Sequence, residues 1–326
     1  MISRSVYAVA SCILAAVIWL SGPLLTREAI AEERITLVAT TGMIADTARR
    51  VGGDLVEVTM LMGPGVDPHA YRQTRTDIVA LVRADLVLWH GLYLEAQMED
   101  FMLDLAEEQT VIAVGESVPT ELLRAHDDYD GRFDPHVWMD PMLWAYVVDD
   151  IASSLAELAP MHAETFRSNA TDYTSELEAL SQYAIETTSS VPEASRVLLT
   201  AHDAFGYFSS AYGFDVIGIQ GISTEGEAGL NRISELVELI VERDIAAVFV
   251  ETSVSDRNMR ALIEGAAAKG HEVTIGGELF SDAMGEEGTY VGTYLGMMDH
   301  NLTIITRALG GEAPETGRIG ELAAGS

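Results

Sequence analysis

The sequence Asp134-Pro135-His136-Val137-Trp138-Met139-Asp140-Pro141 places a histidine between two Asp-Pro steps, with apolar residues around it. Proline fixes its own φ and pushes the residue before it out of the helical region, so Asp134 and Asp140 are held extended. The result is a stiff loop that presents His136 in a set direction. The same tripeptide occurs earlier as Asp67-Pro68-His69. One loop histidine is more often structural than functional, but two matching presentations favour metal ligands.

From Arg34 onward, short β-branched runs alternate with amphipathic stretches, which predicts parallel sheets covered by helices. Strands are predicted at Ile35–Thr40, Val56–Met60, Asp85–Trp89, Val111–Val114, Arg196–Thr200, Asp215–Gln220, Ala246–Glu251 and Glu272–Ile275. Helices are predicted near Met43–Val51, Thr74–Ala84, Leu94–Leu105, Trp144–Leu158, Phe205–Tyr212, Asn231–Arg243, Asp256–Lys269 and Thr293–Leu309. We therefore predict an α/β fold in which four parallel strands with flanking helices occur twice.

A long helix is predicted from Pro160 to about Thr188, between these two sets of strands. Its apolar residues step by four and three, which places them on one face: Phe166, Ala170, Tyr173, Leu177, Leu180 and Ala184. A helix of this span is roughly 40 Å long and could cross a whole domain. We expect an N-terminal lobe at 32–159, a linking helix at 160–190, a C-terminal lobe at 191–309 and a flexible tail at 310–326.

Two further residues follow predicted strands in the second half. His202 comes just after Arg196–Thr200, and Asp282 follows the strand near Glu272–Ile275. In open parallel sheets, ligands bind beyond the carboxyl ends of the strands, where these loops lie. Three imidazoles and one carboxylate suit zinc, and also manganese or iron. Four protein ligands would close a tetrahedral site, which favours holding a metal over using it in catalysis.

The remaining histidines have weaker claims to a role. His90 ends a buried strand, and we interpret it as a core residue or a support for the site. His126 lies in the acidic stretch 126–130, which is either a solvated surface loop or a weak metal-collecting loop. We assign no role to His162, His271 or His300.

The chain is acidic, with a formal net charge of −32 over 326 residues. Nucleic acid is excluded as an expected partner, because phosphate binding needs a basic surface. An anionic membrane face would repel the protein as well. The simplest consequence of so large a charge of one sign is that it keeps the protein soluble.

The N-terminus is typical of a secretory signal. Arg4 gives a positive start, Val6–Leu20 is apolar, and Ala29-Ile30-Ala31 offers a small-residue cleavage site, so we expect a signal peptide at 1–31 and a periplasmic protein. An uncleaved anchor is the alternative. The single cysteine, Cys12, lies inside the apolar run and not after it, which argues against lipid attachment. The mature chain would hold no thiol ligand.

Together these stretches resemble the cluster A-I (cluster 9) substrate-binding proteins of zinc and manganese ABC importers. The resemblance runs from about Ile35 to Leu309, and five motifs carry it: Gly63–Tyr71, Ala84–Glu95, Asp134–Pro141, His202–Gly213 and Leu279–Gly296. It implies two α/β lobes joined by one rigid helix, with the metal between them. It also implies the ligands His69 and His136 from the first lobe, and His202 and Asp282 from the second.

The resemblance leaves the metal open. Zinc-specialised members carry a histidine-rich loop where this chain has only His126, and manganese-specialised members commonly have glutamate at the position of His202. We expect Zn²⁺ or Mn²⁺ as the transported ligand, with Fe²⁺ less favoured. The expected partner is a membrane permease, and the protein itself is expected to be a monomer and not an enzyme. Binding should weaken below about pH 6 as imidazoles protonate.

Two other classes of protein remain as alternatives. A secreted metallohydrolase would need an open coordination position and a general base. The sequence has no H-E-x-x-H motif, and nothing selects Glu225 or Asp203 as that base. A metal-independent adhesin is the third alternative, since acidic secreted proteins can serve in adhesion.

Overall fold

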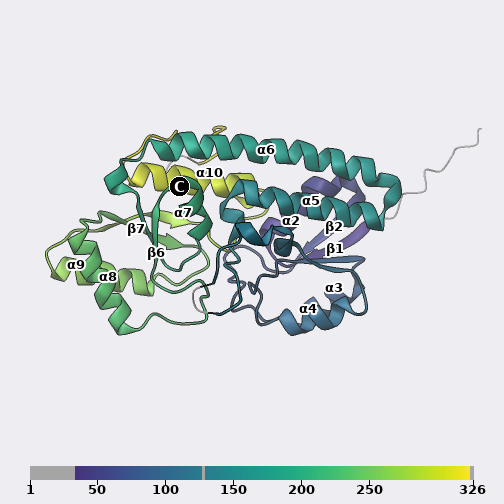
Figure 1. Ribbon diagram of the computed structural model, residues 1–326, viewed down its shortest axis with the longest axis horizontal. Helices are drawn as coiled ribbons and strands as arrows, with labels where there is room; N and C mark the ends of the chain where they lie inside the picture. The colour runs from purple at the N-terminus through teal and green to yellow at the C-terminus, as the bar shows by residue number, and fades with distance from the viewer. Residues whose placement is uncertain (1–33, 127–128, 324–326) are drawn as a thin grey trace, which may run out of the picture. The chain divides into compact units, whose positions relative to one another are not determined.

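The computed structural model describes residues 34–126 and 129–323, and the chain from Arg34 onward forms one compact unit (Figure 1). The expected signal peptide at 1–31 lies outside the described residues. The first half holds a four-stranded parallel sheet in the order β2 (Val56–Met60), β1 (Ile35–Ala39), β3 (Leu86–Trp89), β4 (Val111–Ala113). Strand β3 is buried along its whole length, as expected for a central strand covered on both faces.

The helices of the first half are α2 (Gly42–Gly52), α3 (Arg75–Arg83), α4 (Glu99–Ala106) and α5 (Pro141–Leu158). Helix α5 begins three residues before its predicted start, because Asp140 accepts a hydrogen bond from Met142 N (2.9 Å) and Pro141 fits the first turn. Helix α4 begins five residues later than predicted. The reason is Glu95, whose buried carboxylate accepts from the backbone N–H groups of His90 and Gly91 and so belongs to a turn.

The second half holds four parallel strands, β5 (Val197–Thr200), β6 (Asp215–Gly218), β7 (Ala247–Glu251) and β8 (Thr274–Leu279), with helices α7 (Gly206–Tyr212), α8 (Leu230–Glu242), α9 (Arg257–Ala268) and α10 (Tyr294–Ala308). The α/β class is confirmed. The strands pair as β5-β6 and β7-β8, with β5 beside β7, and not as the single four-stranded sheet that we predicted. The β7–β8 ladder also has a register irregularity, because Val248 is opposite Ile275 and Phe249 is opposite Gly277, which leaves Gly276 of β8 unpaired.

Helix α6 (Ala163–Ser189) has 27 residues and lies between the two sets of strands in sequence. Its predicted apolar face is buried, and it packs on α5 and α2 of the first half and on α10 of the second (Figure 1). A short 3₁₀ turn at Pro160–His162 precedes it. Direct bonds also join the halves: Tyr294 N at the start of α10 donates to Asp46 of α2 (2.9 Å). One continuous core therefore runs past the boundary between the halves.

The residues after α10 make specific contacts. Arg318 N donates to Asp299, Glu312 N donates to Ser190 Oγ, and Leu322 is buried. These contacts argue against fraying of residues 310–323, the described part of the tail that we expected to be flexible. Within residues 34–126 and 129–323, no helix combines the length and the apolar content needed to cross a bilayer.

Candidate metal centre

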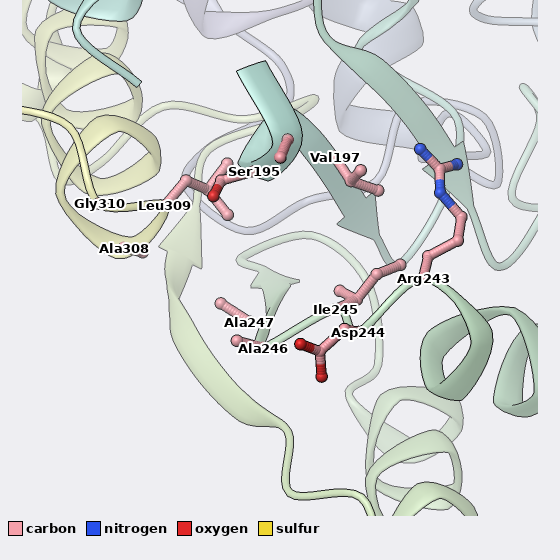
Figure 2. Close-up of a pocket in the computed structure, with 11 residues that line it drawn as sticks. Ser195, Val197, Arg243, Asp244, Ile245, Ala246, Ala247, Ala308, Leu309 and Gly310 are labelled. Atoms are coloured by element: carbon pink, nitrogen blue, oxygen red, sulfur yellow. The ribbon is translucent and has the colours of Figure 1, made fainter. Parts of the chain in front are cut away.

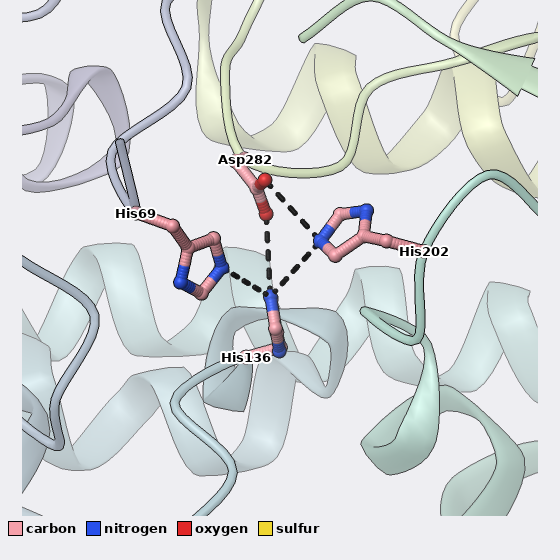
Figure 3. A group of neighbouring side chains, drawn as sticks. All are labelled: His69, His136, His202 and Asp282. Carbon is pink, nitrogen blue, oxygen red and sulfur yellow. Dashed lines mark hydrogen bonds and ion pairs between the residues drawn. The ribbon is translucent and has the colours of Figure 1, made fainter. Parts of the chain in front are cut away.

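Four buried side chains converge on one point: His69, His136, His202 and Asp282 (Figure 3). One ligand-type atom from each lies within 4.8 Å of the others. The Nε2 atom of His136 is 3.3 Å from Nε2 of His69, 3.3 Å from Nε2 of His202 and 3.3 Å from Oδ1 of Asp282. The structure thus brings together all four residues that the sequence analysis nominated.

The loops that carry these residues come from both halves. His69 lies in the loop after β2, and His136 lies just before the 3₁₀ turn Val137–Met139 that leads into α5. His202 follows β5 by two residues, and Asp282 follows β8 by three. Carboxyl ends of parallel strands share one edge of a sheet, so each half contributes loops from the edge where ligands are expected.

Asp134 sets the orientation of His136. Its Oδ1 atom accepts from His136 N (3.0 Å) and from His136 Nδ1 (2.7 Å), so Nε2 faces the centre and offers its lone pair there whenever it carries no proton. Asp134 is only 2% exposed, and its Oδ2 lies 3.7 Å from Arg124 Nε. Helix α7 starts against this carboxylate, and a Cβ on Gly206 would lie 2.7 Å from Asp134 Oδ2. Glycine is needed there for the close approach.

Glu251, at the end of β7, plays the same part for His202. Its Oε1 accepts from His202 N (2.9 Å) and its Oε2 from His202 Nδ1 (2.5 Å), and the residue is 3% exposed. A carboxylate behind a histidine fixes the tautomer and raises the basicity of the nitrogen that faces a metal. Both His136 and His202 therefore point Nε2 into the centre.

Asp282 supplies the charged oxygens. Both of its carboxylate oxygens are buried, and neither has a hydrogen-bond donor among the described residues. They lie 3.3 Å from Nε2 of His136 and of His202. Buried carboxylate oxygens without donors are costly unless a cation compensates them. This donor set, three imidazole nitrogens and one carboxylate, fits a divalent transition metal.

We call His69, His136, His202 and Asp282 together the cage. The pKa values of these four side chains reflect their burial and the neighbouring charges. Burial lowers the pKa of His69 to about 3. Burial also disfavours the charged form of His136, but the hydrogen bond to Asp134 and the charges of Asp134 and Asp282 outweigh it and raise the pKa of His136 to about 9. For Asp282, burial opposes ionisation, yet the facing His202 and His136 hold its pKa well below its usual range. A cation would replace protons at this centre.

Two of the other histidines lie near the cage. His90 is buried, and its Nε2 donates to the carbonyl oxygen of Pro135 (2.6 Å), so it supports the His136 loop, in line with the interpretation from sequence. His126 is 6% exposed with its ring edge-on to Tyr129, so it is not on a solvated surface. Neither belongs to the four-residue cluster.

Sequence reasoning missed Asp134 and Glu251 as supports. Asp134 had a local signal, because an aspartate two residues before a ligand can accept from the histidine N–H, as in an Asx turn. Glu251 had a weaker one, an acidic residue that ends a buried apolar strand.

A separate cavity of about 260 Å³ lies at the opposite, amino ends of β5 and β7 (Figure 2). It is lined by small and apolar residues together with Arg243 and Asp244, and it contains no histidine. Arg243 already pairs with Asp215. This cavity offers no set of metal ligands.

Two α/β halves that close a buried His₃Asp centre define the metal-binding, substrate-binding component of an ABC importer. The chain belongs to the ZnuA family, described as zinc-uptake complex component A, periplasmic, whose model matches residues 37–308. It is 49% identical over 280 residues to the manganese-binding lipoprotein MntA of Bacillus subtilis, covering 86% of this chain and 91% of the relative. It is 43% identical over 284 residues to the zinc-binding protein TroA of Treponema pallidum, covering 87% and 92%.

A solved structure of the periplasmic zinc-binding protein TroA from Treponema pallidum superposes with a TM-score of 0.82 at 44% identity. The match covers 85% of this chain and 99% of that one. The family assignment made from five sequence motifs is therefore confirmed, and these relatives are extracytoplasmic.

Proposed function

We propose that this protein captures one Zn²⁺ or Mn²⁺ ion through His69, His136, His202 and Asp282 and delivers it to a membrane permease. The observation that carries the proposal is the convergence of four ligand-type atoms within 4.8 Å, two from loops of each half. The two buried oxygens of Asp282, which accept no hydrogen bond from the described residues, support it. Four protein donors fill a tetrahedral shell, which favours retention of the ion over catalysis on a bound water.

The choice between the two metals is set by affinity and supply. Three nitrogens favour zinc over manganese on intrinsic affinity, and a carboxylate that binds through both oxygens would suit manganese. The names of the two relatives support both metals, since MntA is called manganese-binding and TroA zinc-binding. We propose that the protein accepts both, and Fe²⁺ less well.

The proposal is tested by stripping the purified protein with chelator and exposing it to equimolar Zn²⁺, Mn²⁺ and Fe²⁺. Metal content after gel filtration should be one ion per chain, and His202→Ala should remove most of it. His271→Gln is the matched control, because His271 binds the backbone oxygen of Ile245 far from the cage. Full stoichiometric binding by His202→Ala would reject the ligand assignment.

Delivery requires that the two halves move. We propose that residues 32–159 and 191–309 act as lobes, and that α6 limits their motion to small shifts, so the permease distinguishes loaded from metal-free monomers by those shifts. Reconstituted permease should take up metal from wild-type protein and not from His202→Ala. Metal uptake by the permease at the same rate with and without this protein would contradict the proposal.

We propose export to the periplasm with the signal at 1–31 removed. The lipoprotein name of MntA weakens our expectation that the chain is free of lipid. Labelling of the expressed full chain with radioactive palmitate, with Cys12→Ala as the control, distinguishes a lipid-anchored protein from a cleaved, free one.

A further inference from the structure

His69 is held differently from the other three members of the cage. Asp134 and Glu251 fix the rings of His136 and His202, and Trp138 Nε1 donates to Ser281 O (2.8 Å), which ties the loop of His136 to the loop of Asp282. For His69, no residue in the described part of the chain hydrogen-bonds to Nδ1. Its ring position therefore depends on its loop.

The loop of His69 is fastened to the other half through Asp67. Asp67 Oδ1 accepts from His69 N (2.9 Å), and Asp67 Oδ2 accepts from Thr224 Oγ1 (2.6 Å). The stretch 61–74 contains no helix or strand, and its own half holds it mainly at its ends, where Met62 N donates to Thr40 O and the Tyr71 hydroxyl donates to Asp77. The Asp67–Thr224 bond thus connects His69 to the second half.

Thr224 lies on a braced loop between β6 and α8. The side-chain amide of Gln220 donates to Thr224 O (3.3 Å) and to Gly226 O (3.0 Å). The neighbouring residue, Glu225, accepts from Gln97 of the first half, which gives a second bond between the halves at the same place. Thr224 is therefore a fixed point against which Asp67 can be held.

A cavity of about 200 Å³ borders this contact, and both Asp67 and Thr224 line it together with Gln220, Glu227 and Ser253. It is large enough for several waters. When the Asp67–Thr224 bond opens, Asp67 and the loop behind it have polar, open space to move into. The other side of the cage has no comparable freedom, because the rings of His136 and His202 are bound to buried carboxylates and the loop of Asp282 is bound to the buried Trp138.

We propose that Asp67 and Thr224 are positioning residues whose hydrogen bond keeps His69 in the cage, and that opening this bond is the first step of metal release. The inference rests on the proposed function of metal capture. It predicts that weakening the bond speeds the loss of metal without slowing its binding. Thr224→Val removes the hydroxyl and keeps the shape and the charge of Asp67, and Thr224→Ser keeps the hydroxyl.

The test is stopped-flow transfer of Mn²⁺ or Zn²⁺ from loaded protein to excess chelator. Loss of one hydrogen bond to a carboxylate should raise the dissociation rate of Thr224→Val by about 10-fold, with the association rate unchanged. Thr224→Ser should restore the wild-type rate. Thr224→Ala is the second truncation, and thermal melting of each metal-free variant establishes that it is folded.

An unchanged dissociation rate in both truncations would overturn the role of this bond, and so would equal acceleration by Thr224→Ser, which would indicate methyl packing instead. Failure of the wild-type protein to hold stoichiometric metal would overturn the proposed function itself. The two failures are therefore distinguished in the same experiment.

Discussion

In the tripeptides Asp67-Pro68-His69 and Asp134-Pro135-His136, the aspartate makes the same hydrogen bond to the backbone of the histidine but a different second one. In each, the aspartate Oδ1 accepts from the histidine N–H, at 2.9 Å and 3.0 Å. Asp134 Oδ1 also accepts from Nδ1 of the His136 ring. Asp67 instead uses its second oxygen, Oδ2, to accept from the hydroxyl of Thr224 in the other half. A local motif fixes the backbone of the loop, but the surrounding fold decides whether the aspartate holds the ring or the loop.

The largest expected effect comes from deleting each histidine in turn. His136→Ala removes the central nitrogen of the cage and leaves the buried Asp134 without its ring partner, so affinity should fall by more than about 100-fold. His69→Ala leaves three well-oriented donors and should retain weak binding. Isothermal titration with Zn²⁺ measures both, and melting of the metal-free variants controls for folding. Equal losses would show that the two copies of the tripeptide contribute alike.

His69 and His136 should also differ in how strongly protons compete with metal for their ring nitrogens. The pKa of His136 is raised to about 9, so a proton competes with metal there throughout the neutral range, while the pKa of His69, lowered by burial to about 3, leaves that ring unprotonated. Affinity should therefore rise with pH up to about 9 and fall by about 100-fold from pH 7.5 to 5.5 for each competing proton. The pH range over which metal affinity changes therefore extends well above pH 6, the value expected from an ordinary imidazole.

Titrations in buffers of different ionisation enthalpy count the protons released on binding. Wild type and His69→Ala should both release at least one proton per metal at pH 7. Metal binding without proton release, or an affinity independent of pH, would contradict the asymmetry between the two rings.

The supporting aspartates give the next effect in size. Asp134→Asn keeps the shape but weakens the bond to His136 Nδ1, and loss of such a support typically costs 10–100-fold in metal affinity. Asp67→Asn should cost less in equilibrium affinity, because its amide can still accept from His69 N and still meet the hydroxyl of Thr224. A larger loss for Asp67→Asn than for Asp134→Asn would reverse our ranking of the two copies.

Much of the fold and the four-residue centre was predictable because the signals are local. The β-branched runs, the apolar stripe of α6 and the stiff Asp-Pro-His loops all lie within short windows. The end of β8 was missed because Gly276 and Gly277 lower strand propensity, yet glycine is needed there: a Cβ on Gly277 would lie 2.3 Å from Ile304 Cγ2 of α10. Helix packing, which no short window contains, set that boundary.

The supports of the site were less predictable for the same reason. Glu251 is 49 residues from His202, and only the pairing of β7 with its neighbours places the carboxylate behind the ring. Thr224 is 157 residues from Asp67. The division of the second set of strands into the pairs β5-β6 and β7-β8 is likewise a matter of long-range pairing that composition does not indicate.

The smallest effect concerns the aromatic residue two positions after each histidine. Trp138 Nε1 donates to Ser281 O across the halves, whereas Tyr71 donates from its hydroxyl to Asp77 Oδ2 (2.7 Å) at the start of α3 in its own half. Trp138→Phe leaves a buried carbonyl without a donor and a small cavity, so the free energy of unfolding should fall by about 1–3 kcal/mol, with a few-fold loss of metal affinity. Tyr71→Phe, at a half-exposed site, should lower it by about 1 kcal/mol or less and leave affinity unchanged. Urea unfolding of the metal-free proteins and titration with Zn²⁺ measure both quantities. Tyr71→Phe could instead weaken metal binding as much as Trp138→Phe does. The hydrogen bond between the loops of His136 and Asp282 would then not explain why one side of the cage stays fixed while the side with His69 opens.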